Sequence, residues 1–280
     1  MRADGPVEPE LSSMGIEWLL YPALGTVAGV LAGLLGVGGG LVLVGALAWL
    51  LPTQGVPADQ AMHAALATSL ASILVTGASS ARSHHKRGSV LWPSVAWLMP
   101  GLLLGGWLGS GFATQLDGDV LRAGVSVFCV AMAVQLLAEW PRPKQRPAEA
   151  PAPRGPGLSG AGAIIGAVSA FVGIGGGSMT VPLLIWRGVA PVRAVGTSSA
   201  CGVGIALASA AGYATHAPAT AMPAGSLGYV YLPAALGIGI ASVLAAPWGV
   251  RLAHRASPRA LKRVFAAFLL AMAWAVAASG

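Results

Sequence analysis

Long apolar runs, separated by short polar segments, make up most of the chain. The runs cover roughly 18–51, 60–81, 90–114, 120–138, 158–186, 194–215, 227–250 and 260–279. A run of about 20 apolar residues is long enough to cross the roughly 30 Å hydrocarbon core of a bilayer as a helix. The pattern therefore predicts an all-α polytopic membrane protein.

The first and the fifth runs each contain a glycine-rich segment near the middle. One reads Gly36-Val37-Gly38-Gly39-Gly40 and the other Gly173-Ile174-Gly175-Gly176-Gly177. Glycine is unfavourable inside a regular helix, so we expect both helices to break there. At about 1.5 Å per residue, the pieces on either side of the second segment are too short to cross the hydrocarbon core. Each of these runs is therefore expected to form a re-entrant helical hairpin that returns to its starting side.

A polar, proline-rich segment at 139–157 separates the fourth run from the fifth. It has no apolar periodicity, and we expect it to be a cytoplasmic linker. It divides a first transmembrane repeat, 18–138, from a second, 158–280. Residues 1–17 carry one Arg and four carboxylates, unlike the basic start of a signal peptide, so we expect a disordered N-terminal tail.

The two halves share motifs in the same order, which indicates an internal duplication. Besides the glycine segments, Thr68-Ser69 corresponds to Thr197-Ser198, and Gly88–Pro93 corresponds to Gly228–Pro233. The expected architecture is thus two repeats, each a glycine-broken hairpin followed by three transmembrane helices.

Charge predicts how these repeats are oriented. The net charge is +7, and Lys and Arg gather in the segments 82–87, 139–157, 187–193 and 251–263. Membrane proteins keep such basic segments in the cytoplasm, so we interpret the excess this way rather than as nucleic-acid binding. If both hairpins return to their starting sides, the halves are inverted repeats, as in many secondary transporters. If the broken runs were full spans, the repeats would be parallel and 251–263 would lie outside, against the charge rule.

The duplicated motifs are the candidate substrate site. Glycine at a helix break exposes backbone N–H groups at the start of a new helix, where an anion is attracted, and hydroxyls can donate to the same anion. The candidate residues are Gly38, Gly39, Gly40, Thr68, Ser69, Gly175, Gly176, Gly177, Thr197 and Ser198, with Arg193 as a cation that attracts substrate. The alternative is that the glycines only allow close packing and the hydroxyls bond to their own helices.

The acidic residues favour an anion over a cation as substrate. No Asp or Glu follows Glu149, and the earlier carboxylates fall near predicted membrane edges, whereas cation pumps and proton relays commonly place such groups within the span. His63 and His216, near the ends of their runs, are candidates for proton coupling. The chain has no P-loop, no cluster of metal ligands and no buried set of acid, base and nucleophile. We therefore expect no cofactor, no metal and no enzymatic activity.

These motifs resemble the TauE/SafE family of sulfite and organosulfonate exporters. The resemblance rests on the duplicated glycine segments, on the Arg193–Ser198 motif and on the basic loop His84–Val90, and it covers about 20–280. It implies a multi-pass permease of the bacterial inner membrane or archaeal plasma membrane that moves small anions such as sulfite and sulfoacetate without ATP hydrolysis. It also implies an anion site at the glycine and hydroxyl positions named above. The first half departs from the pattern at Ala67, where the second has Gly196.

The resulting hypothesis is alternating access, in which a small anion binds between two inverted halves in the lipid bilayer, with protons as a candidate coupling ion. Two other classes stay open. A membrane thiol-redox protein would use Cys129 and Cys201, provided that the two thiols come within disulfide distance. An anion channel would conduct without alternating access. The sequence is also compatible with a homo-oligomer.

Overall fold

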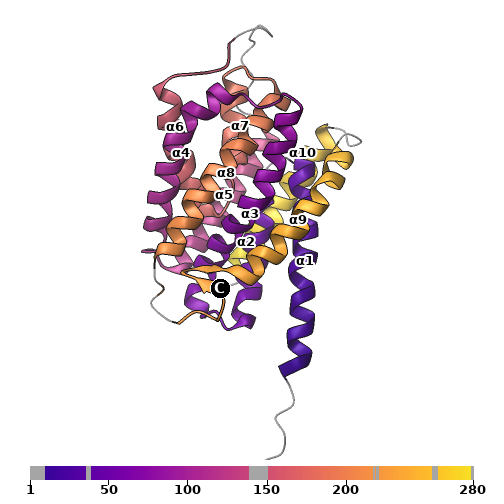
Figure 1. The fold of residues 1–280 in the computed structure, drawn as a ribbon, viewed down its shortest axis with the longest axis vertical. Helices are drawn as coiled ribbons and strands as arrows, with labels where there is room; N and C mark the ends of the chain where they lie inside the picture. The colour runs from indigo at the N-terminus through magenta and orange to yellow at the C-terminus, as the bar shows by residue number, and fades with distance from the viewer. Residues whose placement is uncertain are drawn as a thin grey trace, which may run out of the picture.

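The computed structural model describes residues 10–35, 39–138, 151–216, 218, 221–253 and 258–278. Within these ranges the chain is almost entirely helical (Figure 1). The elements are α1 (Glu10–Leu35), α2 (Gly40–Leu50), η1 (Leu51–Gln54), η2 (Ala58–Gln60), α3 (Ala61–Lys86), α4 (Trp92–Ala113), α5 (Gly118–Leu137), α6 (Pro156–Val172), α7 (Gly177–Trp186), α8 (Pro191–Thr215), β1 (Ser226–Leu227), β2 (Val230–Tyr231), α9 (Leu232–Ala253) and α10 (Pro258–Ala277). The two short strands pair antiparallel, with Ser226 opposite Tyr231.

In the described part of the chain, five helices are long and apolar enough to cross a membrane. They are α3, α4, α5, α8 and α9. The sixth spanning helix that the sequence predicts corresponds to α10, which contributes a shorter apolar segment, Ala266–Ala277. Large apolar side chains such as Leu104, Val127 and Leu244 lie on the outer surface, where lipid rather than water would surround them. The chain is an all-α polytopic membrane protein, as predicted.

Both predicted helix breaks are present. α6 ends at Val172 and α7 begins at Gly177, while α1 ends at Leu35 and α2 begins at Gly40. Gly173 and Gly176 close the two sides of the second break with φ of 75° and 69°. Because these left-handed values strain any residue with a Cβ, glycine is needed at both positions. Gly38 lies outside the described residues.

The structure places helix starts inside both the expected tail and the expected linker. α1 begins at Glu10, so the second part of the expected tail 1–17 is helical, and residues 1–9 lie outside the described ranges. Of the expected linker, 139–150 are not described, and α6 begins within it at Pro156, because proline fits the first turn of a helix.

The first helix of the second half packs along a helix of the first half. Gly101 and Gly109 of α4 face Ser159 and Ala167 of α6, and a Cβ at either glycine would overlap the α6 backbone. Since the contacts advance in the same direction along both helices, α4 and α6 run parallel. Small residues at such spacing let two helix backbones approach closely in a membrane.

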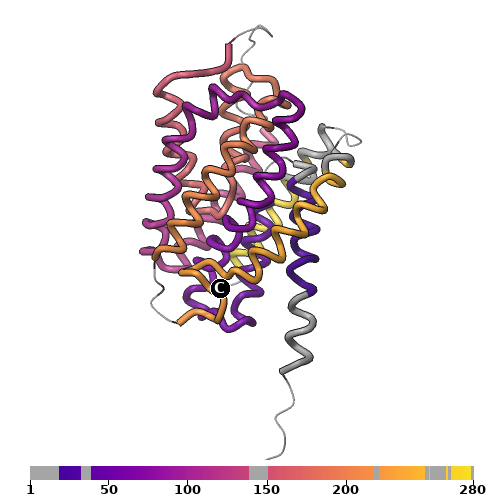
Figure 2. The backbone as a smooth tube through the Cα atoms, viewed as in Figure 1, coloured from indigo at the N-terminus to yellow at the C-terminus, as the bar shows by residue number. Residues whose placement is uncertain are grey.

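The reciprocal pair is formed by α1 and α9. Gly25 and Gly29 of α1 face Ile238 and Ser242 of α9, and the Ser242 hydroxyl donates to Gly25 O at 2.9 Å. These helices also run parallel, and Figure 2 shows the indigo α1 beside the orange and yellow α9. Each half therefore lends its first helix to the other, so the two halves interlock rather than fold as separate bundles.

α3 packs against both α9 and α8, in opposite senses. Thr68 and Ser72 meet Tyr231 and Ala235 in that order, so α3 runs parallel to α9. Against α8, Ser80 lies 3.2 Å from Ser199, whereas Gly77, earlier in α3, faces Val203, later in α8. α3 and α8 are thus antiparallel.

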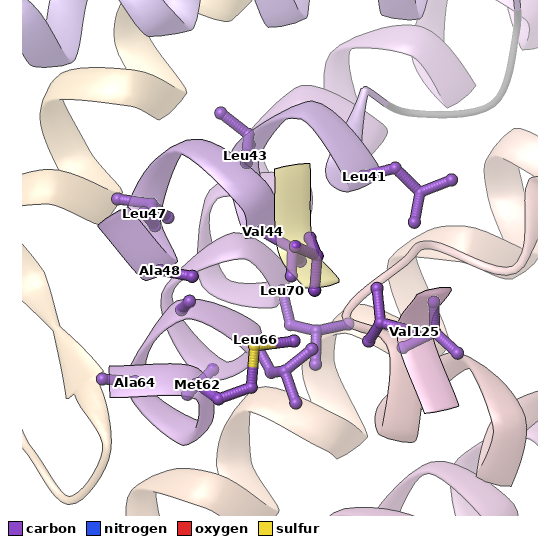
Figure 3. Packing of buried hydrophobic residues seen from close by; sticks show 14 of the residues in the cluster. Leu41, Leu43, Val44, Leu47, Ala48, Met62, Ala64, Leu66, Leu70 and Val125 are labelled. Atoms are coloured by element: carbon purple, nitrogen blue, oxygen red, sulfur yellow. The ribbon is translucent and has the colours of Figure 1, made fainter. Parts of the chain in front are cut away.

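The largest apolar cluster lies where α2 packs on α3 (Figure 3). Leu47, Leu66 and Leu70 are fully buried there. The cluster extends to the second half, because a Cβ placed on Gly173 would stand 2.6 Å from Val44 and 2.8 Å from Leu66 side-chain atoms. This core holds the two helix breaks together.

Candidate substrate site

The two glycine breaks, distant in sequence, lie side by side. The Ser69 hydroxyl of α3 reaches both, at 3.1 Å from Gly40 O and 3.0 Å from Gly173 O, where it acts as the donor. A Cβ on Gly40 would stand 2.8 Å from Gly173 O. Ser69 is completely buried. One hydroxyl therefore ties the two breaks at the centre of the protein.

Each break presents the start of a helix. Met179 N–H and Thr180 N–H donate to Gly176 O at 3.2 and 2.9 Å, and the equivalent amides of α2 donate to Gly39 O. The amides before them, in the first turn, have no carbonyl partner within the helix, and the helix dipole is positive there. Gly40 and Gly175–Gly177 are buried. Both breaks thus have the backbone geometry that attracts an anion.

Thr68 and Thr197 make a reciprocal pair of hydrogen bonds between the halves. Leu91 N–H of the first half donates to Thr197 Oγ1 at 2.9 Å, and Tyr231 N–H of the second half donates to Thr68 Oγ1 at 3.0 Å. The Thr197 hydroxyl in turn donates to Arg193 O at 2.7 Å. We call these two contacts the threonine bridges. They follow the sequence correspondence of the repeats, and their role as anion donors stays a prediction.

Ser198 and Arg193, the remaining predicted site residues, differ sharply in burial. Ser198 is 1% exposed, and its hydroxyl has no hydrogen-bond partner. The Arg193 side chain is exposed in the first turn of α8. Gly202, which contacts Gly175, follows nine positions later, so Arg193 lies roughly 13 Å along the helix from the break. Its role in attracting substrate is thus separate from the break and stays a prediction.

Three further hydroxyls beside the second break were missed by the sequence reasoning. Ser169 of α6 and Ser178 and Thr180 of α7 are at most 5% exposed, and none of these hydroxyls has a hydrogen-bond partner. At the corresponding positions the first half has Ala32, Leu41 and Leu43. Aligning the two repeats residue by residue would have revealed this difference.

The buried interior offers neutral donors only, as far as side chains are described. The buried polar residues there are Ser and Thr, with Gln60 and His63, and include no Lys, Arg, Asp or Glu. Among the described residues no group of three or more His, Cys, Asp or Glu could hold a metal ion. Hydroxyl and amide N–H groups are therefore the donors available to a buried ligand.

His63 lies away from the breaks, at the start of α3. Its Nε2 is 2.9 Å from Leu116 O, its ring packs 5.2 Å from that of Tyr229, and its buried Nδ1 has no partner. Burial and the nearby Asp59 carboxylate raise the pKa of Tyr229, which stays protonated at neutral pH. His216, by contrast, donates from Nδ1 to Gly212 O at 2.6 Å. The Nδ1 atom of His63 is thus buried and free to accept a proton.

The two cysteines lie in different parts of the core. Cys129 on α5 belongs to the cluster around α2 and α3, and Cys201 on α8 belongs to a second cluster with Leu98 and Ile205. Both thiols are free and buried. This placement gives the thiol-redox alternative no paired site.

Comparison with known proteins agrees with this architecture. The chain matches the family profile described as "Sulfite exporter TauE/SafE" over residues 21–276. A Haemophilus influenzae protein named "Probable membrane transporter protein" is 35% identical over 256 residues, covering 91% of this chain and 96% of the relative. A relative from Methanocaldococcus jannaschii with the same designation is 27% identical over 261 residues, covering 90% and 93%. No solved structure matches significantly. The chain is a multi-pass membrane transporter that belongs to the TauE/SafE family.

Proposed function

We propose that this protein is a secondary transporter that moves small sulfur-containing anions, such as sulfite, sulfoacetate and other organosulfonates, across the plasma membrane. The observation that carries the proposal is the meeting of the two helix breaks, at Gly40 and Gly173, on one buried hydroxyl, Ser69, in an interior with neutral donors. Broken helices of this kind form the substrate sites of many secondary transporters. Family membership supports the same conclusion.

We further propose that the halves, 18–138 and 158–280, are inverted repeats that rock about the paired breaks. The helix directions support this. α1, α3 and α9 run one way, and α4, α6 and α8 run the other way. The pair of helices at each break, α1 with α2 and α6 with α7, would therefore begin and end at the same face of the membrane. The two pairs would enter from opposite faces. The basic segments, including the linker 139–157, would then lie in the cytoplasm. Rocking would expose the breaks to each side in turn.

Coupling to the proton gradient or to the membrane potential completes the proposed cycle. His63 supports the proton as the coupling ion, because its buried Nδ1 atom is free to accept a proton. The ring of Tyr229 lies against that of His63, with 5.2 Å between the ring centroids.

The proposal predicts saturable uptake of radiolabelled sulfite and sulfoacetate into proteoliposomes that hold the purified full chain. An inward pH gradient should change the initial rate if protons are coupled, and protein-free liposomes serve as the control. Absence of saturable flux for every small sulfur oxyanion would refute the proposal. Single-channel currents in a planar bilayer would indicate a channel instead, because a carrier turns over too slowly to give them.

Replacing both cysteines should leave this flux within about twofold of the original. Cys129→Ala combined with Cys201→Ala removes two small buried groups that no hydrogen bond or disulfide uses, so the expected change is confined to packing. The measurement is the same uptake assay. Abolished flux in a double variant that keeps its thermal unfolding temperature would bring back the thiol-redox alternative.

A further inference from the structure

Two of the buried hydroxyls beside the second helix break, those of Ser169 and Ser178, have no hydrogen-bond partner, a property they share with the hydroxyls of Thr180, Ser198 and Ser209. Some buried helix hydroxyls donate to the carbonyl four residues earlier, as those of Ser72, Thr76 and Thr197 do at 2.9, 3.0 and 2.7 Å. Ser169 and Ser178 make no such bond, although they are 0% and 5% exposed. A buried donor without a partner destabilises a protein, so its presence calls for a reason such as a ligand.

Both hydroxyls lie at the start of α7. A Cβ built on Gly176 would stand 3.2 Å from Ser169 Oγ, so the Ser169 hydroxyl borders the backbone of the break. Ser178 is the second residue of α7, and side chains in a helix tilt toward its N-terminus. The Ser169 hydroxyl therefore borders the break, and Ser178 lies in the first turn of α7, whose amides have no carbonyl partner within the helix.

The first break has no equivalent donors. Ala32 occupies the position that corresponds to Ser169, and Leu41 the position that corresponds to Ser178. Leu41 is 5% exposed and belongs to the large apolar cluster. The repeat is thus asymmetric at the place where the two halves meet, with polar groups on one side and apolar groups on the other.

Apart from these hydroxyls, isoleucine side chains line the second break, and no Lys or Arg is buried among the residues that the structure describes. Ile73 packs against Gly175, and Ile165 and Ile205 pack against Gly176. Because the cost of burying an ion rises steeply with its charge, neutral donors and a helix dipole suit a single negative charge better than a double one. The Ile205 side chain fills the space beside Gly176 and would move aside when a ligand binds.

We propose that the Gly173–Ser178 break binds an oxyanion head group that carries a single negative charge, with Ser169 and Ser178 as hydroxyl donors. This inference deepens the proposed transport function and rests on it for the class of substrate. Sulfonates fit such a site, because the sulfonate group has three oxygens that accept hydrogen bonds and carries one negative charge. A divalent ion such as sulfate should be disfavoured.

The test measures the binding of methanesulfonate and of sulfate to the purified full chain in detergent by isothermal titration calorimetry. Methanesulfonate should bind at least about tenfold more tightly than sulfate. Ser169→Ala and Ser178→Ala should each weaken methanesulfonate binding about tenfold, as expected for a lost hydrogen bond to a charged group. The thermal unfolding temperature without ligand should not fall, because each change removes an unsatisfied buried donor.

Ser209→Ala is the matched control. Ser209 is also fully buried with an unpartnered hydroxyl, but it borders Gly106 of α4 rather than the break, so binding should stay unchanged. If both variants bind methanesulfonate as tightly as the wild type does, or if sulfate binds as tightly as methanesulfonate, the proposed anion site is refuted. Neither result bears on transport itself, which the flux assay tests separately. If binding follows the expected pattern but the protein shows no flux, the anion site is supported and the transport function is refuted.

Discussion

Gly176→Ala is expected to abolish anion flux in proteoliposomes. Gly176 has φ of 69°, and left-handed backbone costs about 1 to 2 kcal/mol for a residue with a Cβ. A Cβ at this position would also overlap Ile205 Cδ1 and crowd Ser169 Oγ. The added methyl group would displace the start of α7 from the position where its amides meet an anion. Flux and the thermal unfolding temperature are the two measurements.

Gly88→Ala is the control that separates the cost of left-handed backbone from the steric overlap at the break. Gly88 has nearly the same φ, 67°, but a Cβ there would meet nothing within 4 Å. We expect this variant to lose stability by about the same 1 to 2 kcal/mol while keeping most of its flux. If Gly176→Ala transports as well as Gly88→Ala, the second break does not take part in substrate passage.

Thr197→Val is expected to lower the free energy of unfolding by about 1 to 3 kcal/mol and to reduce flux strongly. Valine matches threonine in shape but accepts no hydrogen bond, so the buried Leu91 N–H would lose the acceptor that now lies at 2.9 Å. This bridge joins α8 of one half to the start of α4 in the other. Thr68→Val should act in the same way at the contact between α3 and β2. Thermal unfolding and proteoliposome flux measure both effects.

Thr76→Val is the control for the threonine bridges. Thr76 is 5% exposed, and its hydroxyl donates only to Ser72 O within its own helix, so its loss should change flux little. Thr197→Ser, which keeps the hydroxyl, should restore most of the flux. An unchanged flux in Thr197→Val, or a Thr76→Val defect of equal size, would contradict a role for the bridges in joining the halves.

The sequence carried much information about the site because the site is built from a repeated motif. Matched positions of Thr68 and Thr197 were visible from spacing alone, and the structure joins them by reciprocal bonds to the matched Tyr231 and Leu91. The chemical role of each hydroxyl was not visible. Whether a threonine donates to a ligand or accepts from a backbone amide depends on which group packs against it, and that group is far away in sequence.

By itself the sequence determined the membrane class, the breaks at both glycine segments and the order of the repeats, because these depend on local hydropathy and backbone preference. Only the tertiary structure decided which helices pair. The exchange of α1 and α6 between the halves depends on glycine faces meeting backbone 58 residues or more away, such as Gly101 against Ser159. Likewise, only packing decided that Ser69 ties the breaks while Ser169 and Ser178 stay unpaired. Local pattern fixes which segments become helices, but the partner of each buried polar atom is set by contacts between distant segments.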